Sequence, residues 1–302
     1  MNTNISKSRV ALIGLGTMGA GMAGRLVSAG FPLSVYNRNR ARATQFADRG
    51  AYLASSPREA ASRADIVISM VADDAASRDV WLGENGALAG ANTGSVMIES
   101  STLSVNWVRD LATAAETRGC ELLDAPVTGT KPHAEGGQLL FLVGGKAEAL
   151  DRVLPMLAVL GRDAIHLGPT GSGALMKLIN NFLAAVQAVS FGEALALIEA
   201  GGLDKAKATS ILNEGAPGSP ILKRVAERMV SGDFTPHFLL RLMAKDVSYA
   251  LEEGRQRGME LATASAALDA FKQAIAQGFG EKDFTSVAQA ITGKPRKPAK
   301  TA

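Results

Sequence analysis

Short apolar runs alternate with helical patterns in the first half of the chain. Runs rich in β-branched and other apolar residues predict strands over residues 10–14, 33–37, 66–71, 96–99, 122–125 and 139–143. Segments with apolar residues at helical spacing lie between most of these runs. Such alternation is typical of βαβ units. The first half is therefore predicted to form a mainly parallel sheet with helices on both faces.

The pattern changes after about Leu167. From Gly168 onward alanine, leucine and charged residues recur at helical spacing, and three prolines mark turns, Pro217, Pro220 and Pro236. We therefore predict one domain over residues 1–167 and a helical substrate and oligomerisation domain over residues 168–302.

The longest apolar stretch, residues 174–200, opens the second half. It is interrupted by polar side chains, which favours a buried helix over a membrane span: Lys177, Asn180, Asn181, Gln187 and Glu193. Exposed, this helix would present an apolar patch, so we expect it to pack between domains, between subunits, or both. A homodimer or a homotetramer is the expected assembly.

Five glycines stand in "RVALIGLGTMGAGMAGRL", residues 9–26, where a predicted strand turns into a helix. Gly14, Gly16 and Gly19 have the G-x-G-x-x-G spacing of a Rossmann unit, in which a pyrophosphate lies on the helix N-terminus. A purely structural glycine turn is the alternative. We predict an α/β Rossmann domain followed by an all-α domain with a long interdomain helix, and cofactor contacts from the whole turn: Gly14, Leu15, Gly16, Thr17, Met18 and Gly19.

The end of the second predicted strand indicates which dinucleotide binds. An Asp or Glu usually contacts the ribose hydroxyls there in NAD-binding units, whereas this chain has Asn37 and Arg38, with Arg40 and Arg42 beyond. An amide beside guanidinium groups can bind a 2′-phosphate that a carboxylate would repel. NADPH is therefore the predicted cofactor, the alternative being arginines that are merely solvated.

Composition limits the remaining functions. Hydrophobic residues make up 47% of the 302 residues and charged residues 20%, as in a folded globular protein, and the net charge is only +3. Basic residues cluster only in "PRKPAK" near the C-terminus, a frayed tail or an anion-binding arm, so no nucleic-acid partner is expected. A polar "MNTNISKSR" start and the single cysteine, Cys120, predict a cytoplasmic protein without a membrane span. The histidines lack metal-ligand spacing, so no metal site is expected.

One helix face of the second half carries candidate chemistry. Lys177 and Asn181 are four residues apart and share a face. A lysine among apolar neighbours is costly to bury unless a group pairs with it, and extension of its ammonium to the surface is the alternative. The residues alone leave both possibilities open.

Four motifs in order resemble the β-hydroxyacid dehydrogenase family over residues 9–291: "GLGTMG", "DAPVTGTKPHAEGG", Gly171-x-Gly173-x-x-x-Lys177-x-x-x-Asn181, and "KDVSYA" from Lys245. The family includes 3-hydroxyisobutyrate dehydrogenase, tartronate semialdehyde reductase and the glyoxylate/succinic semialdehyde reductases. The resemblance implies that Lys177 is the catalytic acid/base and that Asn181 is its partner, both next to the substrate.

The same resemblance implies roles for the other motif residues. Thr102 is placed by the nicotinamide, Lys245 near cofactor and substrate, and Met70 and Val71 along the dinucleotide. The remaining implied contacts, to the substrate carboxylate, come from one turn, Thr128, Gly129 and Thr130.

Together these features predict an NADPH-dependent reductase of a small carboxylate-bearing aldehyde, or dehydrogenase of the matching hydroxy acid, with its active site in a cleft between the domains. Where many family members have small residues after the turn, this chain has Lys131, Pro132 and His133, which leaves the substrate open. His133 is either a ligand for a second acidic group or an exposed loop residue. The alternatives are an imine reductase, against which Lys177 argues, and a non-catalytic dinucleotide-binding scaffold.

Overall fold

The computed structural model describes residues 8–291, and the chain divides into two compact units after Lys177. The basic cluster near the C-terminus and the polar residues 1–7 lie outside the described residues. The predicted domain boundary after residue 167 remains a proposal.

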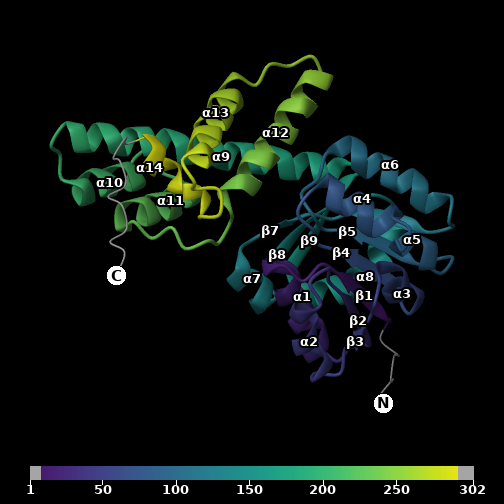
Figure 1. Cartoon of the computed structure of the whole chain (residues 1–302). Helices are drawn as coiled ribbons and strands as arrows, with labels where there is room; N and C mark the ends of the chain where they lie inside the picture. The colour runs from purple at the N-terminus through teal and green to yellow at the C-terminus, as the bar shows by residue number, and fades with distance from the viewer. Residues whose placement is uncertain (1–7, 292–302) are drawn as a thin grey trace. The chain divides into compact units, whose positions relative to one another are not determined.

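A single sheet organises the first unit (Figure 1), in the order β3-β2-β1-β4-β5-β6-β8-β7 with β9 beside β8. Strands β1 to β6 are parallel, β8 is antiparallel to β6 and β7, and β9 is parallel to β8. The predicted Rossmann fold is therefore confirmed. The strands are β1 (Val10–Ile13), β2 (Leu33–Tyr36), β3 (Tyr52–Leu53), β4 (Ile66–Ser69), β5 (Val96–Glu99), β6 (Glu121–Asp124), β7 (Val127–Thr128), β8 (Leu139–Gly144) and β9 (Gly161–Gly168).

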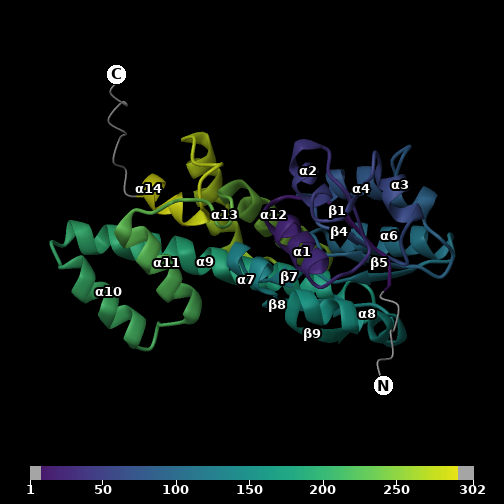
Figure 2. The same ribbon diagram turned by 90° about the horizontal axis from the view of Figure 1, so that it is seen from below.

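Several helices of this unit contribute buried side chains to the core of the sheet, among them Met22, Phe46 and Leu157, and the central strands β1, β4 and β5 are buried along their whole length. Helix α7 lies beside α1 in both Figure 1 and Figure 2. The two helices approach closely, because a side-chain carbon added to Gly21 of α1 would be 2.9 Å from Cβ of Ala134 of α7. These helices are α1 (Thr17–Ser28), α2 (Ala41–Ala47), α3 (Pro57–Ser62), α4 (Asp74–Leu82), α5 (Ala87–Gly90), α6 (Val105–Glu116), α7 (Lys131–Gly136) and α8 (Ala147–Leu160).

The described part of the second unit is helical, which confirms the predicted all-α half. Helix α9 (Ser172–Ala200) runs through the division between the units and is followed by α10 (Lys205–Glu214), α11 (Pro220–Ser231), α12 (Leu240–Gln256), α13 (Ala262–Ala276), η1 (Phe284–Ser286) and α14 (Val287–Ile291). Its mean hydropathy of 1.5 suits a membrane span, but it contributes Phe191 and Leu195 to the core of this unit. We therefore describe α9 as a core helix.

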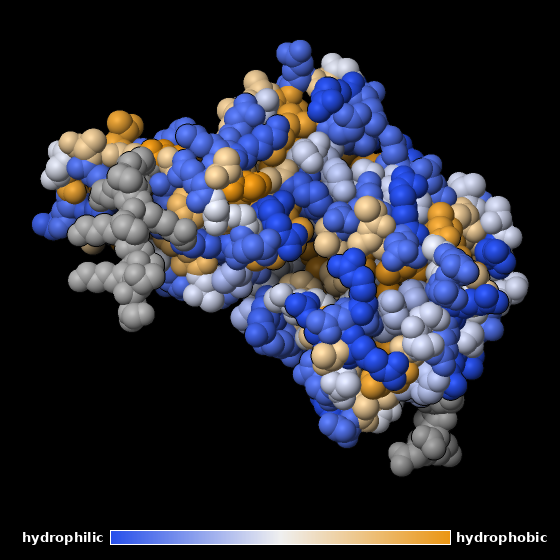
Figure 3. Space-filling view, in the orientation of Figure 1, coloured by the Kyte–Doolittle hydropathy of each residue, from blue (hydrophilic) through white to orange (hydrophobic). Residues whose placement is uncertain are grey.

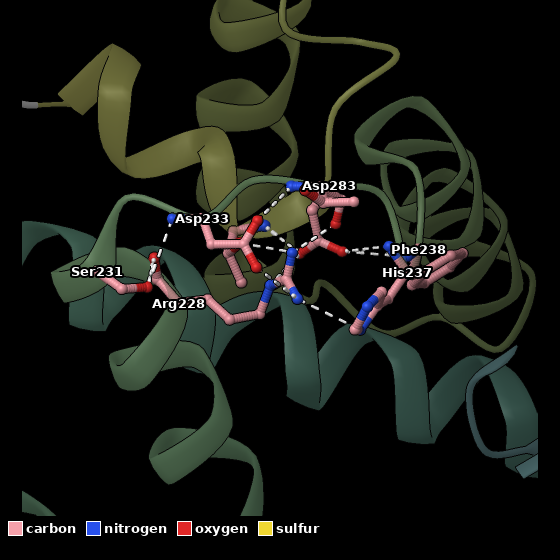
Figure 4. A network of polar contacts seen from close by, with 8 residues as sticks. Arg228, Ser231, Asp233, His237, Phe238 and Asp283 are labelled. Atoms are coloured by element: carbon pink, nitrogen blue, oxygen red, sulfur yellow. Dashed lines mark hydrogen bonds and ion pairs between the residues drawn. The ribbon is translucent and has the colours of Figure 1, made fainter. Parts of the chain in front are cut away.

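A buried carboxylate organises the connection between α11 and α12 (Figure 4). Asp283 accepts hydrogen bonds from the backbone N–H groups of His237 and Phe238, at 2.9 and 3.1 Å. The Arg228 guanidinium lies 3.6 Å from the same carboxylate and also donates to the carbonyl oxygen of Thr235. These contacts fix the chain just before α12, the helix that carries the "KD" pair.

Polar residues dominate the face of the molecule shown in Figure 3, and hydrophobic residues are scattered among them. Such scattered exposure is ordinary for a folded protein.

Candidate active site

Two glycines of the first turn lie where no other residue fits. Gly14 follows β1 with a φ of +95°, a conformation that L side chains rarely adopt, and a side-chain carbon there would overlap the carbonyl oxygen of Met70. A carbon on Gly19 would overlap the carbonyl oxygen of Gly14. The turn is therefore packed tightly against the end of β4, next to Met70 and Val71.

Gly16 differs from Gly14 and Gly19, because no heavy atom beyond its immediate chain neighbours lies within 4 Å of the position its side-chain carbon would take. It is the N-cap of α1, no side chain caps this helix, and its first turn holds no acidic residue. The backbone N–H groups at such a helix start are the donors that a pyrophosphate accepts from. The open space and the donor set fit a nicotinamide dinucleotide.

Asn37 supports this turn from the end of β2. Its Oδ1 accepts a hydrogen bond from the N–H of Leu15 at 2.8 Å, and its Nδ2 donates to the carbonyl oxygen of Asn39, also at 2.8 Å. The sequence predicted contact with the cofactor but missed this supporting role. Arg38, Arg40 and Arg42 are exposed, and within residues 8–291 no carboxylate is within ion-pair distance of them.

A buried glutamate joins the segment after β4, which contains Val71, to the segment after β5, which contains Ser101 and Thr102. Glu99, 1% exposed at the end of β5, accepts hydrogen bonds from Trp81 Nε1 at 2.7 Å and from the N–H of Ser101 at 2.9 Å. Ser101 Oγ in turn accepts from the N–H of Val71 at 2.8 Å, and Thr102 follows directly. Burial raises the pKa of Glu99. Two segments predicted to border the cofactor are thus joined by a residue that the motifs did not single out.

The predicted carboxylate-binding turn connects β7 to α7. Thr128 ends β7, Gly129 has a φ of +133°, and Thr130 is the N-cap of α7. His133 Nδ1 accepts from the N–H of Thr130 at 3.2 Å and lies 2.9 Å from Thr130 Oγ1. His133 thereby completes a capping box at the start of α7, with contacts to both the backbone and the side chain of Thr130. His133 is exposed, but its ring is held by the turn.

The two predicted catalytic residues both lie on α9. Lys177 is half-buried, and Asn181 is 4% exposed. Asn181 Nδ2 donates to Asp246 Oδ2 at 2.6 Å, and the other carboxylate oxygen of Asp246 lies 3.0 Å from Lys245 Nζ. Asp246, itself 1% exposed, therefore joins two predicted site residues of the second unit.

The sequence offered a weak signal for Asp246, since it is the second letter of the "KD" motif. Its importance arises from a contact with a residue 65 positions away, which no local pattern encodes. The assignments of all these residues to cofactor and substrate remain predictions. Among residues 8–291, no group of three or more His, Cys, Asp or Glu side chains is placed to hold a metal ion.

Both halves of the chain match models of known protein families. Residues 9–168 match the model for the NAD binding domain of 6-phosphogluconate dehydrogenase. Residues 171–291 match the model for the NAD-binding domain of NADP-dependent 3-hydroxyisobutyrate dehydrogenase.

Three relatives resemble the chain over nearly its whole length. The NAD-dependent L-serine dehydrogenase of Pseudomonas aeruginosa is 36% identical over 92% of this chain and 96% of its own. Glyoxylate/succinic semialdehyde reductase 1 of Arabidopsis thaliana is 32% identical over 93% of this chain and 98% of its own. The structure of Mycobacterium tuberculosis 3-hydroxyisobutyrate dehydrogenase with L-serine has a TM-score of 0.87 at 30% identity, covering 94% of this chain and 99% of that one.

Proposed function

Because the chain belongs to the β-hydroxyacid dehydrogenase family, we propose that it interconverts a small aldehyde acid and its hydroxy acid with NADPH as the hydride donor. Substrates of 3-hydroxyisobutyrate, tartronate semialdehyde or glyoxylate/succinic semialdehyde type fit this proposal. Relatives named for L-serine and for semialdehydes support the substrate class, since both kinds of molecule carry a carboxylate near the reacting carbon.

The preference for NADPH over NADH is supported by the end of β2. Asn37 replaces the carboxylate that commonly contacts the ribose of NAD, and its side chain is already committed to Leu15 and Asn39. The exposed guanidinium group of Arg38, which pairs with no carboxylate of the described residues, is available for a 2′-phosphate. A carboxylate at position 37 would repel that phosphate.

In the proposed mechanism, the Gly14–Gly19 turn would hold the pyrophosphate of the dinucleotide, whose nicotinamide would supply the hydride for the carbonyl carbon. Lys177 Nζ donates a proton to the carbonyl oxygen as negative charge grows there, and accepts it back in the oxidation direction. The turn at Thr128, Gly129 and Thr130 binds the substrate carboxylate and orients the reacting carbon. Asn181 contacts the substrate hydroxyl or the lysine from the same face of α9.

One observation carries this proposal beyond dinucleotide binding. Asn181 is buried and held by Asp246, whose second oxygen pairs with Lys245. Buried ionic groups are costly to maintain, so a scaffold that only binds a dinucleotide would gain nothing from this arrangement on the helix that carries Lys177.

Turnover measurements test the proposal. Consumption of NADPH, and of NADH in parallel, is followed with glyoxylate, succinic semialdehyde, methylmalonate semialdehyde and tartronate semialdehyde. L-serine and 3-hydroxyisobutyrate with NADP⁺ test the oxidation direction. Efficient turnover of at least one aldehyde acid or hydroxy acid with the phosphorylated cofactor supports the proposal. Tight NADPH binding without turnover on the whole panel contradicts it.

Lys177→Arg tests the acid/base role, because arginine keeps the positive charge but does not release its proton at accessible pH. We expect turnover to fall by about 100-fold or more while NADPH binding persists. Met176→Ala, one position earlier and exposed, is the matched control and should change turnover little. Undiminished turnover in Lys177→Arg would remove this lysine from the mechanism.

We also propose a cytoplasmic homodimer or homotetramer. Two large apolar side chains support a subunit contact, because Leu197 on α9 is 74% exposed and Ile211 on α10 is 71% exposed. Light scattering on the purified protein tests this, and a monomer at micromolar concentration would contradict it.

A further inference from the structure

Asp124 caps the helix that carries Lys177 from a distant strand. It is the last residue of β6 and is fully buried. Its Oδ1 accepts a hydrogen bond from the N–H of Gly171 at 2.8 Å, and its Oδ2 accepts from the N–H of Ala174, also at 2.8 Å. These N–H groups belong to the start of α9, where backbone donors have no partner within the helix. One carboxylate therefore uses both oxygens to bind one helix start.

The surroundings leave this carboxylate little freedom to move. A side-chain carbon added to Gly144 would lie 2.5 Å from Asp124 Oδ1, and one added to Gly173 would lie 2.6 Å from the carbonyl oxygen of Asp124. Both glycines permit a backbone approach that any larger residue would block. Burial raises the pKa of Asp124 to about 6, despite the favourable bonds from the amides. Burial thus disfavours the charged form of Asp124, because the carboxylate loses its hydration. An acid at such a position indicates that its contacts with the helix start are important.

The chain places Asp124 between two predicted parts of the active site. Thr128, the first residue of the carboxylate-binding turn, follows Asp124 by four positions, and Lys177 follows Ala174 by three. The two segments are far apart in sequence and are brought together through this single side chain.

We propose that Asp124 is a positioning residue, which fixes the first turn of α9, and with it Lys177, to the strand end that leads into the substrate turn. This inference rests on the proposed function of Lys177. Asp124 itself does not touch the substrate or the cofactor in this proposal. Displacement of a reacting group by about 1 Å can reduce turnover by about 100-fold, so loss of the cap should act on the chemical step.

Asp124→Asn tests the inference against a matched cap. Asparagine keeps one acceptor oxygen, but its NH₂ group would face the second backbone N–H, so it cannot satisfy both donors. Asp204 caps α10 with a single bond, from the N–H of Lys207 at 2.8 Å, which asparagine can replace. Asp204→Asn is therefore the same substitution at a cap where it should be harmless.

In Asp124→Asn we expect kcat to fall about 10- to 100-fold, with the NADPH dissociation constant within about twofold of wild type. Asp204→Asn should retain both values. Wild-type kcat in folded Asp124→Asn overturns the inference, and so does a parallel loss of NADPH binding, which would indicate general structural damage. Absence of turnover in wild type, or full turnover in Lys177→Arg, instead overturns the proposed function.

Hydrogen exchange on the unsubstituted protein provides a test that does not depend on how the variant folds. The amides of Gly171 and Ala174 should exchange more slowly than the first-turn amides of α8, whose N-cap Lys146 provides no side-chain bond. Equal exchange at the two helix starts would overturn the inference.

Discussion

Substituting alanine for Gly16 separates cofactor binding from stability. At Gly16 the backbone has φ −70° and ψ −166°, which alanine adopts without strain, and no heavy atom beyond the immediate chain neighbours lies within 4 Å of the new methyl group. Alanine also has less conformational entropy to lose on folding than glycine. We therefore expect the free energy of unfolding to stay constant or rise by up to about 1 kcal/mol.

Dinucleotide binding should respond in the opposite direction. The methyl group would extend into the open space at the N-terminus of α1, where the pyrophosphate must approach the backbone closely. We expect the NADPH dissociation constant to rise at least about tenfold, which corresponds to about 1.4 kcal/mol of binding free energy. Fluorescence titration with NADPH measures this change, and urea unfolding without cofactor measures stability.

Gly19→Ala is the matched control, because the same methyl group there overlaps the carbonyl oxygen of Gly14. Relieving that overlap requires the helix start and the strand end to separate, at a cost of about 1 to 3 kcal/mol in the free energy of unfolding. If Gly16→Ala binds NADPH as tightly as wild type, or unfolds more easily than Gly19→Ala, the assignment of the turn is wrong.

Three further outcomes follow from the polar contacts. Asn37→Asp keeps the acceptor for Leu15 but adds a negative charge at the ribose, so the ratio of NADPH to NADH affinity should fall at least about tenfold in parallel titrations; an unchanged ratio would contradict the NADPH proposal. Glu99→Gln must place an NH₂ group against either Trp81 Nε1 or the N–H of Ser101, so the free energy of unfolding in urea should fall by about 1 to 3 kcal/mol. The control is Glu121→Gln, at a partly exposed residue, which should lower this free energy by less than about 1 kcal/mol. Because folding raises the pKa of Asp124 from 3.8 to about 6, its contribution to stability is fully present below pH 3.8 and is lost as the pH rises through 6. The destabilisation of Asp124→Asn relative to wild type should therefore shrink by up to about 3 kcal/mol between pH 4 and 7, and a pH-independent difference would contradict the raised pKa.

Local patterns were sufficient for the main strands but not for the edges of the sheet. The buried strands β1, β4 and β5 are apolar except for the last residues of β4 and β5, Ser69 and Glu99, and were predicted to within two residues. Strands β3 and β7 have two residues each, too few for a periodic signal. Strand β9, "GRDAIHLG", is mostly exposed and has polar residues at several positions, so its pairing with β8 sets its structure.

The candidate site shows the same division between local and distant information. Gly14, Gly16 and Gly19 are recognisable because backbone geometry requires them at fixed spacing. Asp124 and Asp246 were not predicted, since each acts through hydrogen bonds to residues at least 47 positions away in the chain. The contacts that support a site are therefore harder to find from sequence than the residues that form it.

The packing of α7 on α1 has a consequence for altering the substrate range. Lys131, Pro132 and His133 are exposed, whereas the next residue, Ala134, is fully buried against Gly21. A directed-evolution library can therefore vary Lys131 and Pro132 beside the predicted substrate turn at little cost to folding, whereas changes at His133 would also remove its contacts with Thr130. Ala134 and Gly21 form one steric unit, and enlarging either would push apart the helices that follow the cofactor turn and the substrate turn.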